Sequence, residues 1–139
     1  MKNAFSYRQG ELHCEGVPLR KLAAEFGTPL YVYSENHIVG QYQALDRAFR
    51  GLDHLICYAM KANSTLAVLR ALAAEGAGFD IVSGGELYRV LQAGGDPARC
   101  VFSSVGKTRD EIEYALRQGI YCFNVESEAE LQFLSDVAY

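Results

Sequence analysis

The chain has 139 residues, of which 50% are hydrophobic and 22% charged, and its formal net charge at pH 7 is −4. These values are typical of one ordinary globular domain, and the scattered basic residues favour no nucleic-acid partner. The apolar stretches are short and residues 1–8 lack the apolar core of a signal peptide, so we expect no membrane span and a cytoplasmic location.

Residues 1–33 predict an N-terminal segment of strands and helix that leads into a second region. Two short antiparallel strands flank Arg8-Gln-Gly10, and a helix that begins near Pro18 ends at Gly27. The predicted strands, helix and extended segment occupy residues 5–7, 11–14, 18–26 and 28–33.

The second region, residues 34–139, begins with an amphipathic helix capped by Ser34. From residue 54 onward one unit repeats: a short apolar run, a polar turn, and a helix with apolar residues at three- and four-residue spacing. The apolar runs lie at residues 54–60, 78–82, 100–103 and 120–124. This alternation predicts parallel βα units whose strands are covered on both faces.

Three of the helices in this region begin with a hydroxyl residue that is followed three positions later by a glutamate, the pattern of a reciprocal capping box. The pairs are Ser83 and Glu86, Thr108 and Glu111, and Ser127 and Glu130. The apolar residues that we expect to face the core in the last helix are Leu131, Leu134 and Val137.

Four parallel βα units form either a small open sheet or half of an eight-stranded barrel. A closed (β/α)8 barrel needs about 250 residues. We therefore predict an α/β fold, the first half of a (β/α)8 TIM-type barrel preceded by a short N-terminal β-hairpin and helix. Two open sheet edges would make self-association a reasonable hypothesis.

The four cysteines are far apart, form no Cys-x-x-Cys pair and have no histidine at ligand spacing, so we expect no metal site. Three of them, Cys57, Cys100 and Cys122, fall in the apolar runs. A reduced thiol packs there as a small hydrophobe.

The stretch Tyr58-Ala-Met-Lys61-Ala-Asn63 places a lysine at the end of the first apolar run. A lysine that is desolvated by its neighbours and lacks a fixed carboxylate partner is the residue type that forms a Schiff base with an aldehyde cofactor or a carbonyl substrate. A lysine after a strand is more often a solvated surface charge, so this stretch alone leaves both interpretations open.

Several further stretches follow this one in a characteristic order. They are Gly78-Phe-Asp-Ile-Val-Ser-Gly-Gly-Glu-Leu-Tyr88, Val101-Phe-Ser-Ser-Val-Gly-Lys107-Thr108 and Phe123-Asn-Val-Glu-Ser-Glu-Ala-Glu-Leu131. In these stretches the chain resembles the diaminopimelate decarboxylases, of the alanine-racemase-like class of pyridoxal-phosphate enzymes. The resemblance covers nearly the whole chain and implies pyridoxal 5'-phosphate as cofactor, an amino acid as substrate, and a homodimer for the full-length family member.

The resemblance also implies roles for individual residues. Lys61 would bind pyridoxal phosphate covalently at the carboxyl end of the first barrel strand, and Asp80 would be the acidic residue close to it. The alternative role for Asp80 is to accept turn amides, but its place at a strand tip favours the functional role. Glu86 matches a second acidic residue of the class, although we favour its capping role. Asn63 and Ser83 begin helices and could also contact the cofactor.

Lys107 lies in the loop after the third predicted strand, near the expected opening of the site. A cation there could attract an acidic substrate. We expect instead that it is a solvated loop charge.

The implied reaction is decarboxylation of meso-diaminopimelate to L-lysine and CO2, in lysine biosynthesis. The open alternatives are a related ornithine or arginine decarboxylase, a racemase of the same barrel class, a non-catalytic carrier of pyridoxal phosphate, and an inert truncated fragment. The family's glycine-rich phosphate loop, its histidine that stacks on the cofactor and its acidic partner of the pyridine nitrogen are expected beyond residue 139. We therefore expect an N-terminal portion that is inactive alone.

Overall fold

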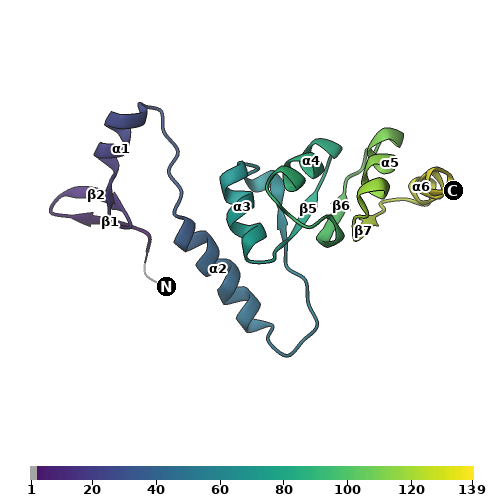
Figure 1. Ribbon diagram of the computed structural model, residues 1–139, viewed down its shortest axis with the longest axis horizontal. Coiled ribbons are helices and arrows are strands. Elements are labelled where there is room, and N and C mark those ends of the chain that lie inside the picture. Colours follow the sequence, from purple (N-terminus) through teal and green to yellow (C-terminus); the bar gives the residue numbers. More distant parts are fainter. Residues whose placement is uncertain (1–2) are drawn as a thin grey trace.

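The computed structural model describes residues 3–139, so residues 1 and 2 of the predicted N-terminal segment lie outside the described residues. The N-terminal sheet and the parallel βα units lie toward opposite ends of the elongated molecule, with α2 between them (Figure 1). The first sheet is antiparallel, in the order β1-β2-β3, and is followed by a helix. Its elements are β1 (Phe5–Arg8), β2 (Glu11–Cys14), β3 (Val17–Pro18) and α1 (Leu19–Phe26). The predicted hairpin and helix are confirmed, and the division between residues 33 and 34 stays a prediction.

Helix α2 (Glu35–Ala48) begins after Ser34, as predicted, because the Ser34 hydroxyl accepts the backbone N–H of His37 at 3.0 Å. The same hydroxyl donates to one carboxylate oxygen of Glu15 at 2.5 Å, and Asn36 Nδ2 donates to the other at 2.7 Å. These two hydrogen bonds, that from Ser34 first, hold the pKa of Glu15 below its usual value. They connect the turn after β2 to the first turn of α2.

Four parallel strands form the second sheet in chain order, and a helix follows each strand (Figure 1). The strands are β4 (Cys57–Ala59), β5 (Gly78–Ile81), β6 (Cys100–Ser103) and β7 (Cys122–Asn124). The helices are α3 (Leu66–Ala74), α4 (Gly84–Gln92), α5 (Arg109–Gln118) and α6 (Glu128–Ala138), with short 3-10 helices η1 (Met60–Ala62) and η2 (Pro97–Arg99). The four predicted βα units are confirmed.

Three of the predicted apolar runs are longer than the strands they contain. The run at residues 54–60 forms a strand only at β4, where it pairs with β5, and Met60 already belongs to η1. The runs at 78–82 and 120–124 contain strands that end at Ile81 and begin at Cys122. β4 and β7 are the outer strands of the sheet and have a neighbour on one side only, which limits the pairing.

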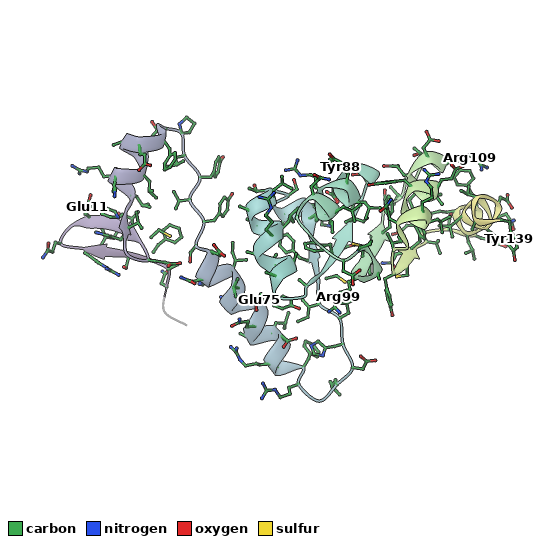
Figure 2. The ribbon with its side chains drawn as sticks, viewed as in Figure 1. Glu11, Glu75, Tyr88, Arg99, Arg109 and Tyr139 are labelled. Atoms are coloured by element: carbon green, nitrogen blue, oxygen red, sulfur yellow. The ribbon has the colours of Figure 1, made fainter. Side chains whose placement is uncertain are left out.

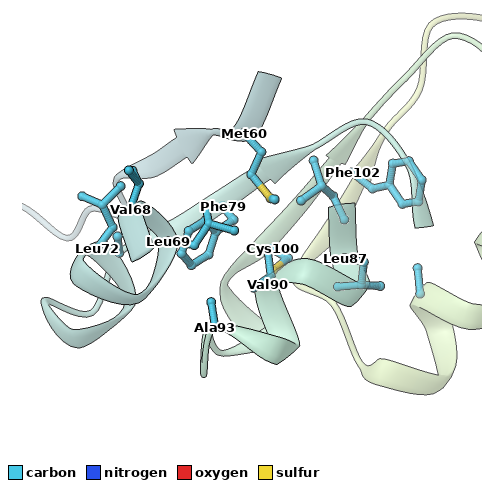
Figure 3. Packing of buried hydrophobic residues seen from close by; sticks show 13 residues of the cluster. Met60, Val68, Leu69, Leu72, Phe79, Leu87, Val90, Ala93, Cys100 and Phe102 are labelled. Atoms are coloured by element: carbon cyan, nitrogen blue, oxygen red, sulfur yellow. The ribbon is translucent and has the colours of Figure 1, made fainter. Parts of the chain in front are cut away.

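The hydrophobic core lies between one face of this sheet and helices α3 and α4 (Figure 3). The aromatic rings of Phe79 and Phe102 are fully buried there, and Leu69, Leu87 and Val90 pack from the helices. The opposite face carries small or polar residues that are half-buried. They are Cys57, Ala59, Asp80, Val101, Ser103 and Cys122. The expectation that the strands are fully covered on both faces is therefore wrong in this structure.

Helix α6 contains no buried residue, although Leu131, Leu134 and Val137 were expected to face the core. Leu131 is 52% exposed, and Leu134 and Val137 are half-buried. The helix follows the outer strand β7 and packs mainly against α5, where the Arg109 guanidinium lies 5.7 Å from the Phe133 ring. Arg109 lies on α5, next to α6 (Figure 2). An end position leaves α6 with neighbours on one side only. No helix within residues 3–139 is both long and apolar enough to cross a membrane.

Of the three predicted capping boxes, only that of Thr108 and Glu111 is reciprocal. Ser83 and Ser127 do accept the backbone N–H of Glu86 and Glu130, but those glutamates accept an N–H one residue further upstream than expected. The backbone explains the difference, because φ is −81° at Thr108 but −158° at Ser83 and −156° at Ser127. The more extended N-cap turns its own N–H out of reach of the glutamate.

Glu111 caps two helices at once. Its Oε1 accepts the N–H of Gly84, the first residue of α4, at 2.9 Å, and its Oε2 accepts the N–H of Thr108 at 3.1 Å. The hydrogen bond from Gly84, followed by those from Thr108, lowers the pKa of Glu111 against the opposing effect of burial. Its ionised form therefore stabilises the fold above the unfolded-state pKa of about 4.3, and this contribution is lost as pH falls through the lower folded-state pKa.

We expect Glu111→Gln to lower the free energy of unfolding at pH 7 by about 1 kcal/mol, the typical value of a cap. Below pH 5 the variant should lose stability with pH less steeply than the unsubstituted chain. Urea denaturation between pH 7 and pH 3 measures both effects. Glu113→Gln, on the same helix, removes only surface ion pairs with Arg109 and Arg117 and is the control. Equal acid slopes for Glu111→Gln and the unsubstituted chain would contradict the prediction.

Candidate functional site

Lys61 is the middle residue of η1, directly after β4. Its neighbour Met60 is 1% exposed and is anchored in the core, whereas Lys61 is exposed. The ion pairs formed within residues 3–139 do not include Lys61, so it has no fixed carboxylate partner there. Of the two conditions for a Schiff-base lysine, the lack of a fixed carboxylate partner is therefore met within the described residues. The second condition, desolvation by neighbouring residues, is not met, because Lys61 is exposed.

Asp80 is the third residue of β5 and lies in register with Ala59 of β4 and Val101 of β6. Lys61 is two residues beyond Ala59, so the two candidate residues belong to the carboxyl ends of adjacent strands. The Asp80 Oδ1 atom is buried and has no hydrogen-bond partner within residues 3–139. A buried oxygen without a donor carries a desolvation cost that a ligand donor would relieve.

Ser83 and Glu86 lie at the same edge of the sheet, where β5 leads into α4. The Ser83 hydroxyl accepts the N–H of Glu86 at 3.2 Å, and Glu86 Oε2 accepts the N–H of Val82 at 2.8 Å. Both side chains therefore stabilise the start of α4, the role that we favoured for Glu86.

Asn63 follows η1 directly, before the first turn of α3. Its Oδ1 accepts the N–H of Thr65 at 2.9 Å, and its backbone carbonyl accepts the hydroxyl of Tyr58 at 3.2 Å. Its side chain thus orders the turn between η1 and α3.

Lys107 is buried, and the expectation of a solvated loop charge is wrong. Its side chain is 0% exposed, and its Nζ donates to the carbonyls of Ser104 and Asn124 at 2.6 and 2.7 Å and to Glu130 Oε1 at 2.6 Å. The Phe102 ring centroid lies 5.8 Å from the same nitrogen. We call Lys107, Ser104, Asn124 and Glu130 the Lys107 cluster.

The Lys107 cluster joins the loops that follow β6 and β7. These strands are neighbours, so their carboxyl ends bring the carbonyl of Asn124 close to the loop of Lys107. All three ammonium donors are satisfied, which explains how a lysine can be buried. The carboxylate that Lys107 binds belongs to Glu130, the third residue of α6, which lies 23 residues further along the chain, so no local pattern in the sequence indicates the contact.

Two cysteines in the sheet, Cys57 and Cys100, have thiols with raised pKa values. All four are free, and burial raises the pKa of Cys100 to about 12. Burial, followed by the charge of Asp80, also raises the pKa of Cys57. Both thiols stay protonated near neutral pH, in agreement with the predicted reduced packing role.

Within residues 3–139, the carboxyl edge of the parallel sheet thus carries a lysine outside any ion pair and a carboxylate oxygen without a hydrogen-bond donor, at the ends of adjacent strands. Polar side chains at the carboxyl ends of parallel strands are typical of barrel-type α/β proteins.

The comparisons with known proteins identify the family. The family model described as "Pyridoxal-dependent decarboxylase, pyridoxal binding domain" matches residues 35–139, and the chain belongs to this family. The resemblance to this group of enzymes, the partial-barrel fold and the predicted cofactor are thereby confirmed.

Individual relatives agree with this assignment. Diaminopimelate decarboxylase from Pseudomonas aeruginosa is 60% identical over 136 residues, which cover 98% of this chain and 33% of the relative. The crystal structure of AQ1208 from Aquifex aeolicus matches with a TM-score of 0.91 at 50% identity, over 96% of this chain and 33% of that one. Diaminopimelate decarboxylase from M. jannaschii in complex with L-lysine matches with a TM-score of 0.90 at 35% identity, over 97% and 32%. The chain thus spans about a third of the length of these relatives.

Proposed function

We propose that this chain binds pyridoxal phosphate through Lys61 and serves the decarboxylation of meso-diaminopimelate to L-lysine and CO2. The observation that carries the proposal is that adjacent strand ends hold a lysine outside any ion pair of residues 3–139 and a buried carboxylate oxygen without a donor among the same residues. The substrate is proposed because curated relatives at 50–60% identity are named diaminopimelate decarboxylases.

The residues present fit this cofactor. Lys61 offers an exposed primary amine that no carboxylate of residues 3–139 neutralises, as a covalent bond to an aldehyde requires. Asp80 offers an oxygen that lacks a donor. When bound, pyridoxal phosphate supplies a ring that accepts the electron pair released at the α-carbon as CO2 leaves.

The chain's own residues would hold and orient the reactants. Asp80 would accept a hydrogen bond from a nitrogen at this edge and would favour the protonated form of that nitrogen. Ser83 and Asn63 are proposed as further cofactor contacts, because both stand where a strand leads into a helix. Glu86 would contribute mainly by capping α4, since one of its carboxylate oxygens already accepts the N–H of Val82.

Incubation with pyridoxal phosphate, reduction with borohydride and peptide mass mapping test the binding role of Lys61. We expect most of the label on Lys61, its loss in Lys61→Ala, and weaker labelling in Asp80→Asn. Lys21, an exposed lysine of α1, reports nonspecific reaction, and the buried Lys107 should stay unlabelled. Label spread over many lysines and unchanged by Lys61→Ala would contradict the proposal.

Substrate preference needs a separate measurement. Release of CO2 from meso-diaminopimelate, ornithine and arginine, measured side by side with a protein in which this chain is joined to the remaining two thirds of its relatives' length, should be fastest with meso-diaminopimelate. A preference for ornithine or arginine would assign the chain to a related decarboxylase. A homodimer and a cytoplasmic location are also proposed, and light scattering tests the former.

A further inference from the structure

The segment that carries Lys61, residues 60–65, runs from the end of β4 to the start of α3. Its first residue is fixed by packing, because Met60 is in the hydrophobic core (Figure 3). Its last part is ordered by hydrogen bonds from Tyr58 to the carbonyl of Asn63 and from the N–H of Thr65 to the side chain of Asn63. These bonds join the segment only to itself and to β4.

A further hydrogen bond reaches this segment from the next βα unit. Arg89 Nε on α4 donates to the backbone carbonyl of Ser64 at 2.9 Å. Arg89 lies between Leu87 and Val90, which are both fully buried. Packing of these two residues in the core fixes the position of the helix that carries Arg89. Because α4 follows β5, the Arg89 side chain links the backbone after Lys61 to the unit that carries Asp80.

This hydrogen bond connects the backbone three residues after Lys61 to the βα unit of Asp80. Lys61 has no carboxylate partner of its own within the described residues. The direction of its side chain therefore depends on the position of its backbone. Small displacements of a reacting group reduce reaction rates strongly. We propose that Arg89 is a positioning residue, which fixes the segment 60–65 so that Lys61 faces the edge occupied by Asp80. The consequence for Lys61 chemistry rests on the proposed function, whereas the fixing of the segment does not.

The test uses Arg89→Met, which keeps an apolar stem and a good helix former but removes the donors. The control is Arg70→Met, which removes an exposed arginine from the middle of α3. Arg89→Lys retains the charge and a hydrogen-bond-donating ammonium group, although not the guanidinium geometry, and should restore part of the effect. The first readout is amide hydrogen exchange at residues 62–66. The second is the ratio of pyridoxal phosphate labelling at Lys61 to that at Lys21.

We expect Arg89→Met to speed exchange in the segment by about threefold, because the hydrogen bond that it removes is exposed to solvent and contributes near the low end of the usual range. The labelling ratio should fall in the same variant and recover in part in Arg89→Lys, while Arg70→Met changes neither readout. Unchanged exchange in Arg89→Met would overturn the proposal. Faster exchange with an unchanged labelling ratio would also overturn it, because Arg89 would then only stabilise the loop.

The two readouts separate the failure of this proposal from the failure of the proposed function. If the unsubstituted chain shows no preference for Lys61 over Lys21, the cofactor proposal fails. The exchange measurement then decides by itself whether Arg89 fixes the segment. Urea denaturation of each variant establishes that a change at Lys61 does not reflect global unfolding.

Discussion

Lys107→Met is expected to lower the free energy of unfolding by about 3 kcal/mol, the typical cost of removing one partner from a buried ion pair. Methionine keeps most of the apolar stem but offers no donor. The carbonyls of Ser104 and Asn124 and the carboxylate of Glu130 would each lose a hydrogen bond of 2.6 or 2.7 Å. Urea denaturation followed by circular dichroism measures the loss.

A matched control and a second substitution make this result specific to the Lys107 cluster. Lys21→Met removes an exposed lysine from α1 and should change stability by less than about 0.5 kcal/mol. Glu130→Gln should also destabilise the fold, because the single amide oxygen of glutamine cannot accept from both Lys107 and the N–H of Glu126. The double substitution should be less harmful than the sum of the single ones, since the two side chains form one network. Additive losses would show that Lys107 and Glu130 act independently.

Gly78→Ala is expected to destabilise the fold by about 2–3 kcal/mol, the upper part of the range for an overpacked site. A Cβ atom at this position would clash with the backbone carbonyl of Arg99 and lie 2.8 Å from Cys57 Sγ. The sulfur can rotate away, but the Arg99 carbonyl belongs to the backbone that leads directly into β6. Thermal or urea denaturation measures the change.

Gly85→Ala is the opposite case and serves as the comparison. Gly85 is exposed on α4, and a Cβ atom there would meet only Ser83 Oγ at 3.8 Å, an ordinary contact. Alanine is a better helix former than glycine by about 1 kcal/mol, so this variant should be stabilised. If both glycine substitutions change stability equally, close packing at Gly78 does not explain its effect.

Local signals in the sequence predict most of the fold. Hydrophobic periodicity places the four βα units, and Ser34 and Thr108 are recognisable as N-caps because their bonds involve residues three positions away. The strand ends are less predictable, since β4 extends only as far as its pairing with β5. The exposure of Leu131 also depends on what lies beside α6, which its own sequence does not contain.

The candidate site is predictable to the same extent. A lysine and an aspartate at the ends of consecutive parallel strands must lie at one edge, so the placement of Lys61 and Asp80 follows from the strand assignment. The burial of Lys107 depends on partners that lie 17 and 23 residues away in the sequence. Likewise, Arg89 contacts a carbonyl that lies 25 residues earlier. No local sequence pattern predicts contacts between residues that are so far apart in the chain.

The contacts of Glu111 on α5 and Glu130 on α6 also have an order in synthesis, because each glutamate binds a residue that precedes it in the chain. Glu111 binds the first amide of α4, and Glu130 binds the ammonium of the loop that precedes α5, so each carboxylate reaches a unit that the ribosome has already made. A nascent chain that has grown only to residue 107 still lacks both carboxylates. The second and third βα units can therefore form these contacts only after the following unit has been synthesised.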